Sequence, residues 1–175
     1  DALDIDDTSR ALELTYETSM LVIVAAENEL APDQLGSLLR RGATEETAAD
    51  YLSAFAAALR DRYRRSLTEV TVDGFTEIGE NYAAVEVTGE GGATIIARRA
   101  PGGLWQVDLV GTLGPPLITQ VRMVLEDSGE GEDAETIREV FESDVMPALD
   151  AAAAADPENL ALASEIRVIR SLLGR

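Results

Sequence analysis

The stretch "YAAVEVTGEGGATIIARRAPGGLWQVDLV", from Tyr82 to Val110, decides the fold class of this chain. Apolar and polar residues alternate through much of it, and two tetrapeptides, Gly89-Glu90-Gly91-Gly92 and Ala100-Pro101-Gly102-Gly103, interrupt the alternation. A period of two predicts β-strands, and clusters of Gly and Pro predict turns. Because turns this short join antiparallel neighbours, the stretch predicts a β-meander.

The alternation starts upstream of this stretch, so we expect four strands, at residues 69–78, 82–88, 94–99 and 104–110. One face of the sheet would be largely apolar and would consist of Val70, Val72, Val85, Val87, Ile95, Trp105, Val107 and Leu109. We expect this face to bend around the early helices and to bury the ring of Trp105, the only tryptophan of the chain.

The opposite face of the predicted sheet would carry Glu86, Arg98 and Asp108. Since antiparallel sheets often leave one face in water, we expect a solvated ladder of cross-strand charges here. The alternative makes Asp108 a general base that Arg98 holds in place.

Helical periodicity flanks the predicted sheet on both sides. The expected helices before it cover residues 7–29, a short segment between Pro32 and Gly42, and residues 44–63; those after it cover 117–125, 137–152 with a kink at Pro147, and 157–173. The predicted fold class is therefore α+β, with N-terminal helices packed on a curved four-stranded antiparallel meander. We expect a cone-like domain at residues 1–113 and a C-terminal helical extension at 114–175, packed on the same domain.

The composition excludes several kinds of function. The chain has 14 basic and 33 acidic residues and a net charge of −19, which disfavours nucleic acid and anionic membrane surfaces as partners. It has no Cys and no His, and all its basic residues are Arg, so thiol, imidazole and Schiff-base chemistry are absent. The acidic run from Glu130 to Glu135 lacks the spacing of a calcium loop. We expect no cofactor, no metal site and no catalytic residue.

The longest apolar run, Met20 to Ala26, is far shorter than the roughly 20 residues that span a bilayer, so we expect no membrane insertion by this segment. The sequence begins at Asp1 without a Met. We therefore expect an upstream segment to have been removed and the protein to be extracytoplasmic, either secreted or anchored through that segment. A cytoplasmic location is the alternative.

Early helices followed by a meander, in which "NYAAVEVTG" leads through a hairpin to "LWQVDLVG", resemble the nuclear transport factor 2-like superfamily. The resemblance covers Asp7 to Gly111 and is greatest to small exported or lipoprotein-type bacterial members. It implies a cone in which helices cross a bent sheet and enclose a pocket. The superfamily includes cyclases, dehydratases and isomerases as well as non-enzymatic binding and dimerisation modules. Its enzymes commonly use a pocket His-Asp or Tyr-Asp arrangement, and this chain has no His.

Six residues are candidates for binding a ligand in such a cone: Tyr16, Met20, Tyr51, Phe55, Trp105 and Asp108. Core packing is the alternative role, and we favour it for Met20, Phe55 and Trp105. The expected function is a non-catalytic binding or assembly module that takes a small apolar ligand or a partner protein through the cone pocket or the sheet face. A homodimer, or a bundle formed between chains by the helical tail, is a further form of assembly. The rival function is a cyclase, dehydratase or isomerase that uses Asp108 or Tyr51.

Overall fold

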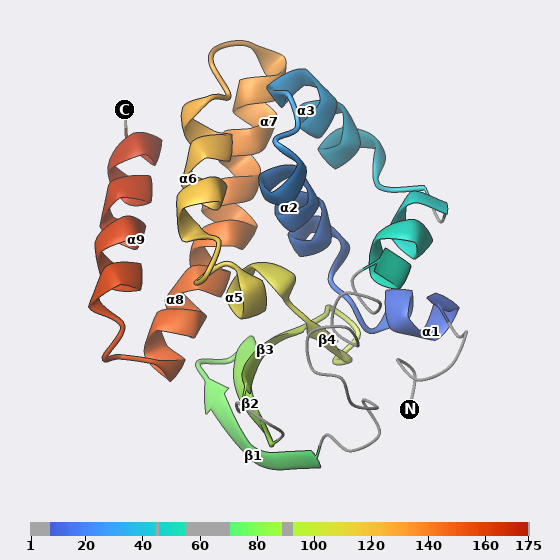
Figure 1. Cartoon of the computed structure of the whole chain (residues 1–175), viewed down its shortest axis with the longest axis vertical. Helices are drawn as coiled ribbons and strands as arrows, with labels where there is room; N and C mark the ends of the chain where they lie inside the picture. The colour runs from blue at the N-terminus through green and yellow to red at the C-terminus, as the bar shows by residue number, and fades with distance from the viewer. Residues whose placement is uncertain (1–7, 45, 55–70, 89–92, 175) are drawn as a thin grey trace.

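The computed structural model describes residues 8–44, 46–54, 71–88 and 93–174, and it has the predicted α+β architecture (Figure 1). The first helices are α1 (Thr8–Glu13), α2 (Glu17–Asn28) and α3 (Pro32–Arg41), and residues 46–54 are also helical. The strands are β1 (Thr71–Ile78), β2 (Tyr82–Thr88), β3 (Ala93–Arg99) and β4 (Trp105–Val107). The later elements are α5 (Leu109–Leu113), α6 (Ile118–Glu126), α7 (Glu132–Val140), the π-helical turn η2 (Phe141–Val145), α8 (Met146–Ala155) and α9 (Leu160–Leu173).

The four strands form one antiparallel sheet in the order β1-β2-β3-β4, which confirms the predicted meander. The register places Phe75 opposite Val85 and Val85 opposite Ile95, so these three side chains share a face. Between Val72 and Gly74 the register shifts, which leaves Asp73 unpaired in a β-bulge. The predicted Val70 lies outside the described residues.

The strand β4 is shorter than predicted, because the chain turns at Asp108. The Asp108 carboxylate accepts a hydrogen bond from the backbone N–H of Gly111 at 3.1 Å and thereby caps α5. Leu109 is consequently a buried residue of a helix, and its predicted position on the sheet face is wrong. Alternation alone does not detect this cap, since Asp108 also fits the polar phase of a strand.

The helices cover the face of the sheet opposite to the one expected. Helix α5 folds back over β3, where the hydroxyl of Thr112 accepts a hydrogen bond from the backbone N–H of Ile96, and α8 contacts β1, β2 and β3 (Figure 1). The residues buried on this covered face include Tyr82, Ala84 and Ile96. On the valine-rich face, Val72 is 66% and Phe75 52% exposed. The prediction that this face wraps around the early helices is therefore wrong.

The early helices join the sheet at β4, where the expected helix over residues 7–29 is interrupted. A parallel bridge pairs Thr15 with Val107: the N–H of Tyr16 donates to the Val107 carbonyl at 2.9 Å, and the N–H of Val107 donates to the Leu14 carbonyl at 2.7 Å. Because these backbone groups are engaged with the strand, α1 and α2 are separate helices. The bridge also fixes Tyr16 beside the sheet.

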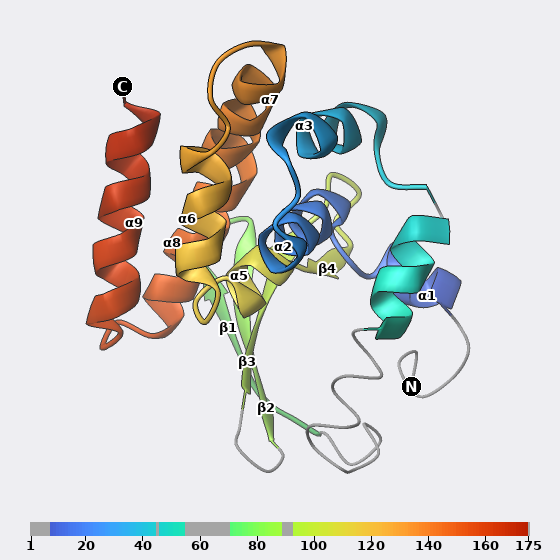
Figure 2. The same cartoon turned by 45° about the horizontal axis from the view of Figure 1, so that its top comes forward.

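A single hydrophobic core joins the N-terminal helices, the sheet and the C-terminal helices. It contains Met20 and Ile23 from α2, Ile96 from β3, Phe141 from η2 and Leu149 from α8. The described part of the predicted extension, residues 114–174, packs on the same core as the preceding elements, and Figure 2 shows α6 and α8 between α9 and the remainder of the fold. None of the described helices is long and apolar enough to cross a membrane.

We predict that Gly111→Ala lowers the free energy of unfolding by about 1–3 kcal/mol, because overpacking of a tight helix–sheet contact has costs of this order. A Cβ at position 111 would lie 2.7 Å from the Cβ of Ile96. Urea denaturation measures the change. Gly102→Ala is the matched control, since its Cβ would meet no atom within 4 Å. A variant of Gly111 as stable as the wild type would contradict the tight contact between α5 and β3.

Candidate functional site

Two regions of the sheet carry the candidate functional residues, one on each face. On the covered face, the side chains of Tyr16, Tyr82, Arg98, Asp108 and Asp144 form a polar cluster, in which neighbouring groups interact electrostatically. They come from the start of α2, from β2, from β3, from the cap of α5 and from η2. Elements distant in sequence therefore converge on this cluster.

Asp144 is the centre of the polar cluster. Its Oδ1 accepts hydrogen bonds from the Tyr16 hydroxyl, at 2.5 Å, and from the Arg98 guanidinium. The guanidinium carbon lies 4.2 Å from the centre of the Tyr16 ring, which is within the range of a cation–π contact. Burial pushes the pKa of Asp144 upward, but the hydrogen bonds from Ser143, Tyr16 and Arg98 outweigh burial and leave the pKa below its usual value.

The π-helical turn η2 brings Asp144 to this position. A π turn inserts one additional residue into a helix, and such turns occur frequently at functional sites. Here the N–H of Met146 bonds to the carbonyl of Phe141, five residues earlier. Neither η2 nor the position of Asp144 was predicted from the sequence. The available signal was Pro147, which lacks an N–H and cannot complete the regular ladder of the preceding turn.

Asp108 is a fully buried carboxylate. Burial raises its pKa to about 6, although the backbone N–H of Gly111 and the charge of Arg98 act in the opposite direction. The prediction of a solvated charge ladder is therefore wrong for Asp108, whereas Glu86 is exposed as expected. Arg98 acts on Asp108 through its charge, but its salt bridge is with Asp144 and not with Asp108. The alternative in which Asp108 is a general base stays a prediction.

Two oxygen atoms of the cluster have no hydrogen-bond partner among the described residues: Oδ2 of Asp108 and the hydroxyl of Tyr82. Burial, followed by the charge of Asp108, raises the pKa of Tyr82, so its hydroxyl keeps its proton. A carboxyl group with a pKa near 6 can take up and release a proton near neutral pH, as general acid–base catalysis requires, and here it lies beside a phenol. With Asp108 0% exposed, however, this conformation offers a substrate no contact with the carboxylate.

The structure separates the six predicted ligand-binding residues. Tyr16 and Asp108 belong to the polar cluster, and Met20, 2% exposed, is part of the core. Tyr51 is half-buried, and its hydroxyl donates to Glu27 at 3.4 Å. Trp105 lies on the opposite face of the sheet. Phe55 lies outside the described residues.

The second region is the apolar face of the sheet, which we call the valine face. Its residues are Val72, Phe75, Val85, Val87, Ile95 and Trp105. Val72 and Phe75 are exposed and the other four are half-buried. The edge of the Phe75 ring meets Trp105, with 5.8 Å between ring centres and 82° between planes. The sequence predicts Val72, Val85, Val87, Ile95 and Trp105 on this face. It does not predict Phe75, which the bulge at Asp73 brings to the face, nor that helices leave the face open.

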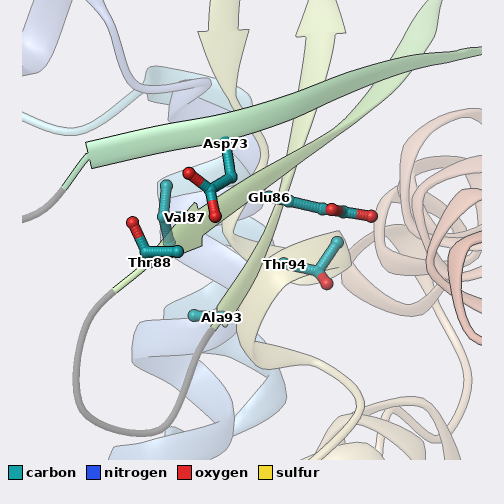
Figure 3. A pocket seen from close by; sticks show the side chains of 6 residues that line it. All are labelled: Asp73, Glu86, Val87, Thr88, Ala93 and Thr94. Carbon is teal, nitrogen blue, oxygen red and sulfur yellow. The ribbon is translucent and has the colours of Figure 1, made fainter.

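A hollow lies at one end of the sheet, where residues of the covered face and of the valine face meet (Figure 3). It is lined by Asp73, Glu86, Val87, Thr88, Ala93 and Thr94. Neither of its two carboxylates forms an ion pair within the described part of the chain. Among the described residues there is also no group of three acidic side chains arranged to hold a metal ion.

Comparison of the chain with protein-family models, curated proteins and solved structures finds no match, so the resemblance to the nuclear transport factor 2-like superfamily stays a prediction.

We predict that Asp108→Asn stabilises the fold at pH 8 and not at pH 4. The pKa of Asp108 is about 6 in the folded state and 3.8 when unperturbed, so folding favours the protonated carboxyl. The stability that this group contributes is fully present below pH 3.8 and is lost as the pH rises through 6. Removing the charge at pH 8 should raise the free energy of unfolding by about 2–3 kcal/mol. The variant leaves the neighbouring titratable groups in place, so the difference between the two pH values reports on position 108. These groups are Arg98, Asp144 and Tyr82.

Urea denaturation at the two pH values, compared between variant and wild type, measures this effect. Glu86→Gln is the matched control, because Glu86 occupies the same face at an exposed position. We expect it to change stability by less than about 0.5 kcal/mol at either pH. An equal effect of Asp108→Asn at pH 4 and pH 8 would refute the raised pKa.

Proposed function

We propose that this protein is a non-catalytic binding module that docks a partner protein on the valine face. The observation that carries the proposal is the exposure of Val72 and Phe75, at 66% and 52%, beside the half-buried ring of Trp105. Adjacent exposed apolar side chains of this size are typical of interaction surfaces, whereas scattered single ones are common on any protein.

The shape of the valine face also suits a partner. Its side chains stand on paired strands, so their positions are fixed before binding and little conformational entropy is lost. Trp105 and Phe75 offer two large rings in contact, and aromatic residues of this kind contribute strongly to binding at interface centres.

The other form of the binding hypothesis, a small apolar ligand in a cone pocket, has less support. That pocket requires open space between α2 and the sheet, yet Met20, Val22 and Ile23 of α2 are each no more than 2% exposed and belong to the hydrophobic core. We therefore favour the sheet face over the pocket. The extracytoplasmic location stays a prediction from the sequence.

An acid–base enzyme is the second candidate, and the polar cluster is the observation that favours it. Asp108 has a pKa near 6, and both Asp108 and Tyr82 keep an unpartnered oxygen on the covered face. Such an enzyme requires α5 or α8 to move away from the sheet before a substrate contacts Asp108. The partner-binding function requires no such movement, and for this reason we rank it first.

The test places a photo-crosslinking residue, p-benzoylphenylalanine, at position 75 in the native host. We expect irradiation to give a discrete adduct of higher mass, because a partner on the valine face would cover this side chain. Denaturing electrophoresis and mass spectrometry detect the adduct and identify its second component.

The same residue at position 123 is the matched control, since Met123 is a similarly exposed apolar side chain, at 45%, but belongs to α6. Adducts of equal yield at both positions, or none at position 75, would rule out the valine face as the docking surface.

A further inference from the structure

We infer that the partner segment on the valine face is basic as well as apolar, with Arg or Lys side chains close to its apolar ones. This inference rests on the proposed function and specifies the chemistry of the partner. It follows from the charges that surround the valine face and from the net charge of the chain.

The strands beneath the valine face carry acidic side chains without partners. Asp73 lies in the bulge next to Val72, and Glu77 lies two residues beyond Phe75 on the same face, opposite Ala83. Both are exposed, and neither forms an ion pair within the described part of the chain.

The basic residues of the sheet do not compensate these carboxylates. Arg98 points to the covered face, where its guanidinium is bound to Asp144. Arg99 is exposed and lies opposite Trp105, so it is the one described cation on the valine face. The two anionic positions along β1 therefore remain open to a partner's cations.

The same charges argue against a second copy of this chain as the occupant. Each chain has a net charge of −19, so two copies brought face to face would repel one another. An acidic partner would meet the same repulsion. A segment that covers Phe75 and Trp105 with apolar side chains, and reaches Asp73 and Glu77 with Arg or Lys, satisfies both features of the surface.

The experiment uses the chain with p-benzoylphenylalanine at position 75, irradiated in native-host lysate at 50 and 500 mM NaCl. A double variant, Asp73→Asn with Glu77→Gln, removes two negative charges beside the crosslinking position. We expect the adduct yield to fall about three- to tenfold in the double variant, as the loss of two exposed ion pairs implies. High salt should lower the wild-type yield by a similar factor, because screening weakens exposed pairs.

The matched control is Asp127→Asn with Glu130→Gln. It removes the same charge from exposed positions between α6 and α7, away from the sheet (Figure 1). We expect its adduct yield to equal that of the unsubstituted chain. Mass spectrometry of the crosslinked peptide should find Arg or Lys within a few residues of the attachment point.

The outcomes distinguish this inference from the proposed function. An adduct at position 75 that is insensitive to salt and to the double variant, or whose peptide lacks basic residues, overturns the basic partner and leaves partner binding intact. An adduct with the mass of two copies of this chain overturns the inference in favour of self-association. The absence of any adduct at position 75 overturns the proposed function and the inference together.

Discussion

The hydrogen bond from the Gly111 backbone N–H to the Asp108 carboxylate is the interaction on which the arrangement of this fold depends. It ends β4 and starts α5, and so determines the side of the sheet to which the chain turns. Gly111 then packs so closely against Ile96 that a Cβ at position 111 would lie 2.7 Å from the Cβ of Ile96. With α5 on this face, α8 and η2 complete the cover, and the valine face stays outside the core.

The two faces of the sheet consequently have different chemical characters. The covered face keeps a polar cluster in which Asp144 has strong hydrogen-bond donors and Asp108 does not, so the pKa values of the two carboxyl groups move in opposite directions. Oppositely shifted acids are a pattern of acid–base catalysts, but here burial closes access to Asp108. The open face has no comparable chemistry and offers apolar area with acidic neighbours. Because a partner can reach the open face and a substrate cannot reach Asp108, we favour binding at the open face over catalysis at the covered one.

The sequence was a good guide to the elements and a poor guide to how they pack. Alternation located the four strands because it is a local property, and it grouped Val72, Val85 and Trp105 correctly on one face. It could not decide which face the helices cover, since Ala84 and Ile96 on the other face are also apolar. The face that the helices cover depends on the cap at Asp108. This cap joins residues only three positions apart, within a stretch whose alternation is that of a strand. Asp144 was missed because its partners, Tyr16 and Arg98, lie 128 and 46 residues away along the chain.

The place of Trp105 has a practical consequence. As the chain contains one indole, the tryptophan fluorescence of the protein arises from a single half-buried ring beside Phe75. Its emission is thus an intrinsic optical reporter for that side of the sheet, free of signal from the helical core. Any molecule that displaces water from this ring would shift the spectrum without an added label.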